Sequence, residues 1–83
     1  MTEVTVLHFA GVRDVTRTDE ERIAVDAEPC TVGDVVRALV VRHPGLADYV
    51  GALRVAKNEA FASTDAEVAT GDVVALIPPV AGG

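Results

Sequence analysis

The chain has 83 residues, of which 49% are apolar, so it is long enough for one small folded domain and too apolar to be disordered. Its net charge of −6 predicts repulsion from phosphate backbones, which argues against a nucleic-acid ligand and favours a partner with a basic surface. Its single cysteine excludes an intrachain disulfide and agrees with a reducing compartment, and the sequence shows neither a signal peptide nor an apolar run of transmembrane length. We therefore expect a cytoplasmic protein that does not act at a membrane.

Two strands are predicted in the first part of the chain. Residues 3–9 alternate so that Val4 and Val6 share one face and Thr5, Leu7 and Phe9 share the other. Residues 10–20 form a polar connection with room for a short helical turn. Residues 21–25 predict a second strand with Ile23 and Val25 on one face.

A helix beginning at Thr31 is the clearest local feature. Thr31 and Asp34 have the spacing of a capping box, in which each side chain binds the other residue's backbone N–H. The apolar positions that follow have the spacing of one buried helical stripe: Val32, Val35, Val36, Leu39 and Val40. Pro44-Gly45 ends the helix, and residues 46–50 have room for a further short helix.

The second half of the chain reads as a hairpin and a final strand. Residues 53–57 and 60–62 flank Asn58-Glu59, which forms either a two-residue turn or part of a longer one. A turn at Thr70-Gly71-Asp72 leads into an apolar strand over residues 73–77. This order of elements predicts an α+β roll over residues 1–77, with one main helix packed across a mixed sheet.

The last strand predicts an apolar patch on the sheet face away from the helix. If Val74 and Leu76 face the helix, then Val73, Ala75 and Ile77 face the other way, where a strand with one solvated face should carry polar residues. If the first strand is its neighbour, Leu7 and Phe9 extend the patch. Such a patch indicates a protein partner, and the alternative is a cover formed by a helix or loop of the same chain.

Residues 78–83 have the sequence Pro-Pro-Val-Ala-Gly-Gly. The prolines end the sheet at Ile77 and favour an extended exit. At about 3.3 Å per residue the segment would reach roughly 20 Å from the body, and glycines at its end would fit a narrow channel. We expect a flexible C-terminal tail that places a terminal carboxylate in another protein's active site; the alternative is a frayed end without function.

The chain resembles the ubiquitin-like sulfur carriers, and among them the small subunits of molybdopterin synthase. The resemblance spans almost the whole chain and rests on residues 10–14 (AGVRD), 31–35 (TVGDV), 42–46 (RHPGL) and 71–83 (GDVVALIPPVAGG). The Gly-Asp turn, strand and Pro-Pro-Val-Ala-Gly-Gly ending form its most specific part. The resemblance implies a β-grasp fold in which the first and last strands are parallel and central.

The resemblance also implies a chemistry for the tail. An ATP-dependent, E1-like activating enzyme would convert the carboxylate of Gly83 to an acyl adenylate, and a sulfur donor would convert that adenylate to a thiocarboxylate, with Gly82 providing clearance. The large subunit of molybdopterin synthase would receive the tail and use its sulfur to build the dithiolene of molybdopterin. The chain would then be a carrier subunit that supplies no acid, base or metal, with no bound cofactor. The further tail residues expected to contact the partner are Pro78, Pro79, Val80 and Ala81.

The apolar docking positions of the family correspond to Phe9, Phe61 and Ile77, and two of these, Phe9 and Ile77, belong to the patch inferred from strand alternation. The chain departs from the family pattern in the first strand and at the hairpin: His8, Lys57, and Asn58-Glu59 in place of the frequent Asn-Gly.

The other polar residues are assigned structural roles. Cys30 is expected to be a small, partly buried residue, because no histidine or second cysteine lies near it in the sequence. His8 and His43 lack the number and spacing of a metal site, and His43 suits the negative end of the helix. The three acidic residues 19–21 are expected in a solvated loop, with steering of a basic partner as the alternative.

Three other functions stay open. The first alternative is a sulfur carrier for thiamine, cysteine or tRNA thiolation. The second is a ubiquitin-like modifier joined through Gly83 to target lysines, and the third is an interaction domain with a passive tail. Pro78-Pro79 favours the molybdopterin branch.

Overall fold

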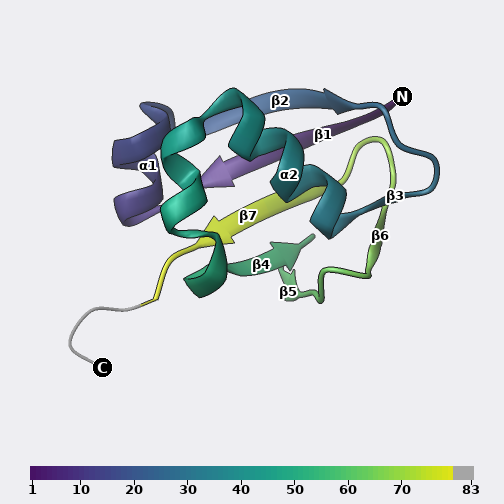
Figure 1. The fold of residues 1–83 in the computed structure, drawn as a ribbon. Helices are drawn as coiled ribbons and strands as arrows, with labels where there is room; N and C mark the ends of the chain where they lie inside the picture. The colour runs from purple at the N-terminus through teal and green to yellow at the C-terminus, as the bar shows by residue number, and fades with distance from the viewer. Residues whose placement is uncertain (80–83) are drawn as a thin grey trace.

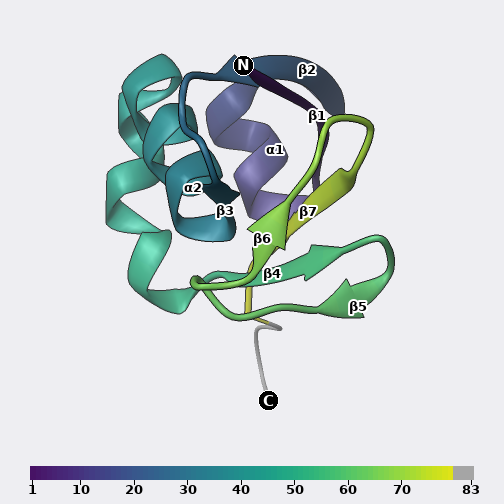
Figure 2. The same cartoon turned by 90° about the vertical axis from the view of Figure 1, so that its right-hand side faces the viewer.

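The computed structural model describes residues 1–79, which form a five-stranded mixed sheet with its helices on one face (Figure 1, Figure 2). In chain order the elements are β1 (Thr2–His8), α1 (Ala10–Thr16), β2 (Glu20–Val25), β3 (Cys30–Thr31), α2 (Val32–Arg42), the 3-10 helices η1 (Pro44–Asp48) and η2 (Val50–Ala52), β4 (Arg54–Lys57), β5 (Ala60–Phe61), β6 (Glu67–Val68) and β7 (Val73–Ile77). The sheet has the strand order β2-β1-β7-β4-β5, and β3 and β6 form a separate pair. No helix within residues 1–79 is long and apolar enough to cross a membrane.

The first and last strands lie side by side in the centre of the sheet. They run parallel, in a register that pairs Thr5 with Val73 and His8 with Leu76. β2 flanks β1 and β4 flanks β7, both antiparallel. The expected mixed sheet with a parallel central pair is therefore confirmed. Because β1 and β7 point the same way, Phe9 and Pro78, which follow them, leave the sheet at the same edge.

The core lies between the sheet and α2. Val4 and Val6 of β1 and Val74 and Leu76 of β7 are buried on the helix-facing side, as strand alternation predicts. The alternate residues of β7 are half-buried on the other face of the sheet. The prediction that each central strand turns alternate residues toward and away from the helix is confirmed. The sheet face turned away from the helix has no helical cover (Figure 2).

The predicted capping box at the start of α2 is confirmed. The Thr31 hydroxyl accepts the Asp34 N–H at 3.2 Å, and the Asp34 carboxylate accepts the Thr31 N–H at 3.0 Å. The predicted stripe faces the sheet, with three of its residues buried and two packed at its margin: Val32, Val35 and Leu39, then Val36 and Val40. Valine-rich α2 is thus held by tertiary packing more than by intrinsic propensity.

The connection after β1 is a two-turn helix, α1, more extensive than the helical turn that the sequence allowed. Val12 and Thr16 are its buried residues. Arg17 ends the helix in a left-handed conformation, and its N–H donates to the Arg13 carbonyl at 2.8 Å. Pro44 and Gly45 end α2 as predicted, but the chain continues as two 3-10 helices. A Cβ on Gly45 would lie 2.9 Å from a methyl group of Val15, so a larger residue here would force η1 or the Val15 side chain to shift.

The small β3–β6 pair was not predicted, because strands of two residues carry no periodicity. The loop that leads to β6 binds the first turn of α2. The Thr64 carbonyl accepts the Gly33 N–H and the Ala66 carbonyl accepts the Val32 N–H, both at 2.9 Å. These bonds satisfy first-turn N–H groups that lack an intrahelical partner.

The β4–β5 hairpin adopts the shorter of the two turns considered. Ala56 pairs with Phe61 and Lys57 with Ala60, which leaves Asn58 and Glu59 as the only turn residues. Both have positive φ, 49° and 72°, the signature of a type I′ turn.

Candidate functional site: an apolar groove beside the tail

The sheet face without helices carries an open groove of about 600 Å³. Its lining comes from β1, β4 and β7 and from the hairpin: Leu7, Phe9, Ala56, Asn58, Glu59, Phe61, Val73, Ala75 and Ile77. Most of these side chains are apolar, and no helix or loop within residues 1–79 fills the groove. The predicted patch is therefore present, and the alternative of a cover from the same chain does not hold for the described residues.

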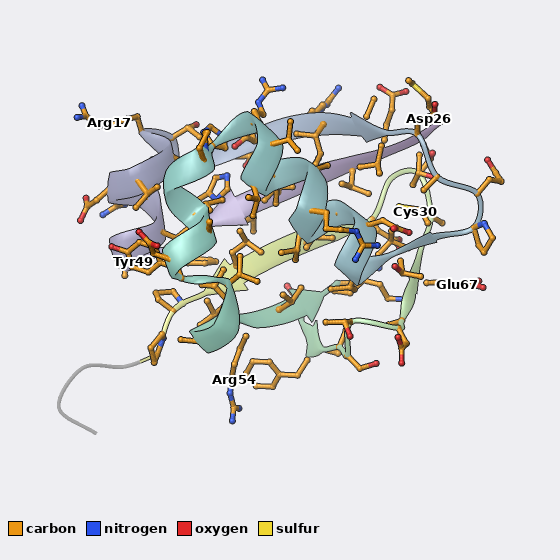
Figure 3. The ribbon with its side chains drawn as sticks, viewed as in Figure 1. Arg17, Asp26, Cys30, Tyr49, Arg54 and Glu67 are labelled. Atoms are coloured by element: carbon orange, nitrogen blue, oxygen red, sulfur yellow. The ribbon has the colours of Figure 1, made fainter. Side chains whose placement is uncertain are left out.

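Two exposed aromatic rings stand at the sides of the groove. Phe9, just after β1, is 47% exposed, and Phe61 in β5 is 67% exposed. The Arg54 guanidinium lies 5.3 Å from the centre of the Phe61 ring, and Arg54 extends from the start of β4 away from the helices (Figure 3). Exposed rings beside a concave apolar surface are typical of protein interfaces. The three residues assigned to docking, Phe9, Phe61 and Ile77, thus line one groove, and their contact with a partner stays a prediction.

A hydrogen-bond network fixes the hairpin tip at one end of the groove. The Asn58 carboxamide accepts the Val73 N–H at 2.9 Å and donates to Asp72 at 3.0 Å. Asp72 also accepts the Ala69 N–H at 2.8 Å. The bonds from Ala69 and Asn58 favour the ionised carboxylate and lower the pKa of Asp72. The Gly71-Asp72 turn, which needs positive φ (97°) at Gly71, thereby holds the hairpin against the start of β7.

The tail leaves the domain at the other end of the groove. β7 ends at Ile77, as the prolines predict, and Ile77 also lines the groove. Pro78 is half-buried and Pro79 is exposed, and neither belongs to the groove lining. The predicted site residues Val80, Ala81, Gly82 and Gly83 lie outside the described residues.

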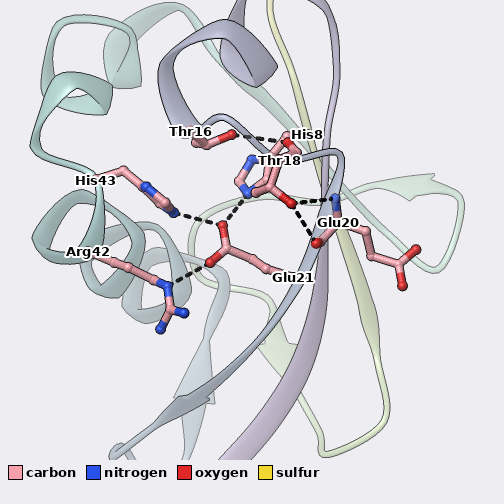
Figure 4. A network of polar contacts seen from close by, with 7 residues as sticks. All are labelled: His8, Thr16, Thr18, Glu20, Glu21, Arg42 and His43. Carbon is pink, nitrogen blue, oxygen red and sulfur yellow. Dashed lines mark hydrogen bonds and ion pairs between the residues drawn. The ribbon is translucent and has the colours of Figure 1, made fainter.

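A second polar cluster lies on the helix side of the sheet, where α2 ends (Figure 4). One Glu21 carboxylate oxygen lies 2.6 Å from His8 Nε2 and 2.8 Å from His43 Nε2. Arg42 Nε lies 2.7 Å from the other oxygen. The cluster joins the end of α2 to β1 and β2. The expected solvated loop at residues 19–21 is therefore wrong for Glu20 and Glu21, which both belong to β2. Glu20 is exposed on the strand, whereas the side chain of Glu21 is only 11% exposed.

The contacts of Glu21 favour its ionised form and indicate which ring nitrogen of each histidine donates to it. An ionised carboxylate only accepts hydrogen bonds, so both ring Nε2 atoms carry the hydrogen. Burial opposes the charge on Glu21, but the hydrogen bonds from His8 and His43 outweigh burial and lower its pKa. His8 Nδ1 is buried without a hydrogen-bond partner within residues 1–79.

The same three residues are chemically able to hold a metal ion, because their ligand atoms lie within 4.8 Å of one another. Ligands around a tetrahedral zinc ion lie about 3.3 Å apart, whereas both nitrogen–oxygen distances here are those of direct hydrogen bonds. Arg42 adds a positive charge to the cluster. We therefore assign it a structural role. The sequence reading missed it because His8, Glu21 and His43 are far apart in the chain.

Cys30 lies at the start of α2 and is not a candidate for the sulfur chemistry. Its side chain is buried, with the residue 2% exposed, rather than partly buried as expected. Burial raises the pKa of the thiol, which keeps it protonated and unreactive at neutral pH.

The central parallel pair, the crossing helix and the tail-bearing last strand define a ubiquitin-like β-grasp protein. Consistent with this class, SAMP1 from Haloferax volcanii superimposes with a TM-score of 0.88 and 34% identity over 98% of this chain and 99% of its own. The chain belongs to the ThiS family, whose profile matches residues 6–83.

Two further relatives are informative. The molybdopterin synthase sulfur carrier subunit of Mycobacterium tuberculosis is 36% identical over the full length of both chains. A chain in the Amycolatopsis orientalis BexX/CysO complex has a TM-score of 0.73 and 26% identity, covering 96% of this chain and 99% of its own.

Proposed function

We propose that this chain is the sulfur carrier subunit of a molybdopterin synthase, and that sulfur is loaded on the carboxylate of Gly83. The observation that carries the proposal is the arrangement of β7, which lines an open apolar groove and continues directly into the Pro78-Pro79 tail. One strand thus connects a surface suited to docking with a segment suited to delivery. The full-length similarity to a molybdopterin synthase sulfur carrier subunit supports this assignment.

The proposed reaction proceeds in two steps on the tail. A Gly83 carboxylate oxygen attacks the α-phosphate of ATP in an activating enzyme, which releases pyrophosphate and leaves an acyl adenylate. A sulfur nucleophile at the sulfide level (HS⁻) then attacks the carbonyl carbon, AMP departs with the electrons of the C–O bond, and loss of the S–H proton leaves the thiocarboxylate. If the donor is a persulfide, the same attack gives an acyl disulfide, and a second thiol must cleave its S–S bond to release the thiocarboxylate. The carrier contributes no catalytic side chain to either step, and Gly82 allows the end of the tail to enter a narrow site.

The proposed partner is the large subunit of the synthase. Docking through the groove would hold the thiocarboxylate at the acceptor, so that sulfur transfer becomes an effectively intramolecular step. A related chain crystallised in a complex with a second protein supports a binary partnership. The activating enzyme and the sulfur donor are the other partners, and a cytoplasmic location is part of the same proposal.

A protein modifier is the second candidate, and one observation favours it. SAMP1, with its TM-score of 0.88, is named a small archaeal modifier protein. In that role the activated Gly83 carboxyl group would be transferred to a lysine amine of a target instead of receiving sulfur.

Intact mass spectrometry tests the proposed function. The full chain is incubated with its activating enzyme, ATP and a sulfur donor, and a variant lacking Gly82 and Gly83 serves as control. We expect one oxygen to be replaced by one sulfur in the full chain only, followed by transfer of that sulfur when the large subunit and a pyranopterin precursor are added. Absence of the sulfur adduct would contradict the carrier role. Gly-Gly remnants on lysines of cellular proteins, without that adduct, would favour the modifier.

A further inference from the structure

Glu59 occupies a backbone position that disfavours its side chain. Its φ of 72° lies in the left-handed region, which glycine adopts freely and other residues adopt under strain. Asn58 precedes it with φ of 49°, and asparagine tolerates this region well. Asn-Gly is the preferred pair for such a turn, so this chain keeps a carboxylate where glycine would be more stable. Strained residues of this kind concentrate at functional sites.

The position of Glu59 in the groove suggests why the carboxylate is kept. Glu59 is exposed, and it is the one charged residue among those of residues 1–79 that line the groove. It forms no ion pair with any other described residue. The Asn58–Asp72 hydrogen bond fixes the turn from which it projects. The structure therefore holds an uncompensated negative charge at the rim of an otherwise apolar surface.

A positive charge also lies beside the groove. The backbone of Arg54 pairs with Ile77, and its guanidinium lies 5.3 Å from the centre of the Phe61 ring, at the β5 side of the groove. Lys57 pairs with Val74, so the hairpin tip that carries Glu59 lies toward the end of the groove opposite Ile77. A positive charge beside Phe61 and a negative charge at the hairpin tip are separate charges around one groove, and such an arrangement helps to set the orientation of a bound partner.

We propose that Glu59 is a partner contact, and that its carboxylate binds an arginine or lysine of the protein that covers the groove. The inference rests on the proposed function, in which this groove docks the large synthase subunit. A basic contact also suits a chain with a net charge of −6. The contact orients the partner so that its tail-binding channel lies at the Ile77 end of the groove.

This proposal differs in a measurable way from a purely structural role for the turn. If Glu59 only forms the turn, Glu59→Gly should improve the fold and leave binding unchanged or stronger. If Glu59 contacts a partner, the same variant should stabilise the fold and weaken binding. Glu59→Gln keeps the length of the side chain and removes only its charge.

The experiment measures the dissociation constant of the full chain with the large molybdopterin synthase subunit of the same organism, at low and high salt, beside the melting temperature of each variant. We expect Glu59→Gly to melt a few degrees higher than the wild type. Both Glu59 variants should bind about threefold or more weakly at low salt, with a smaller salt dependence. Glu20→Gln is the matched control, because Glu20 is exposed and its substitution removes the same charge outside the groove.

Wild-type affinity in both Glu59 variants would overturn the proposal, as would an equal loss in Glu20→Gln. Failure of the wild type to bind the large subunit would also overturn it. Formation of the thiocarboxylate does not depend on this contact, so a sulfur adduct together with unchanged binding by the Glu59 variants would refute the contact and leave the carrier role standing.

Discussion

Replacing Glu21 with glutamine tests whether the polar cluster at the end of α2 stabilises the fold. The variant keeps the shape of the side chain and removes the charge that two ring N–H groups share. A hydrogen bond to a charged group contributes about 1.5–3 kcal/mol and one between neutral groups about 0.5–1.5 kcal/mol, so each histidine contact should lose about 1 kcal/mol. The Arg42 contact adds little, because that side chain is 58% exposed. The expected loss in the free energy of unfolding is about 2 kcal/mol.

Thermal unfolding followed by circular dichroism measures this loss. In a domain of this size, about 2 kcal/mol corresponds to a decrease of roughly 8–16 °C in Tm. The neighbouring Glu20→Gln substitution is the control, because that exposed carboxylate has no cation partner among the described residues. Its effect should stay within about 0.5 kcal/mol.

The pH dependence gives an independent check on the same variant. The pKa of Glu21 is lower in the folded than in the unfolded chain, so its ionisation stabilises the fold above the unfolded pKa. This contribution is lost as the pH falls through the lowered value. The difference between wild type and Glu21→Gln should therefore shrink in acid. A difference in Tm of less than 2 °C at neutral pH (about 0.5 kcal/mol or less), or one that persists unchanged at the acid end of the titration, would refute the role assigned to the cluster.

Three further predictions concern other parts of the fold. Thr31→Ala removes the capping box with Asp34 and should lower the free energy of unfolding by about 1 kcal/mol in a denaturant titration, and an unchanged midpoint would contradict the cap. Asp72→Ala removes the acceptor for Asn58 and should cost about 1 kcal/mol at neutral pH. Because the pKa of Asp72 is lowered in the fold, this difference should also decrease in acid, and a pH-independent effect would argue against the hydrogen bonds. Cys30 should react with a thiol reagent only in denaturant, since it is buried and its pKa is raised, and labelling of the folded chain at the rate of a small thiol would contradict both observations.

The sequence predicted the elements whose residues repeat with a regular period. The alternation in β1 and β7 and the apolar stripe of α2 each identify a buried face, and the Thr31–Asp34 spacing locates the start of the helix. The parallel pairing of β1 and β7 was expected only through the family resemblance, because pairing between distant strands leaves no local pattern. The β3–β6 pair was missed because strands of two residues carry no periodicity.

The groove and the Glu21 cluster differ in how far the sequence revealed them. The apolar face of the groove follows from alternation, since residues of β7 on both faces are apolar. The cluster joins His8, Glu21 and His43 from three elements, and nothing in their spacing brings them together. Glu21 was read as part of a charged run, yet the register of β2 with β1 turns its side chain toward the helices.

The central position of β7 has a consequence for the order in which the protein is made. Thr5 pairs with Val73, which lies near the other end of the chain. The central strand pair can therefore form only after the last strand has been synthesised. Such distant pairing makes folding slow relative to a chain with local contacts. The groove, which β7 helps to line, forms only on a chain translated through Ile77. A chain that ends before Ile77 therefore lacks both part of the groove lining and the tail.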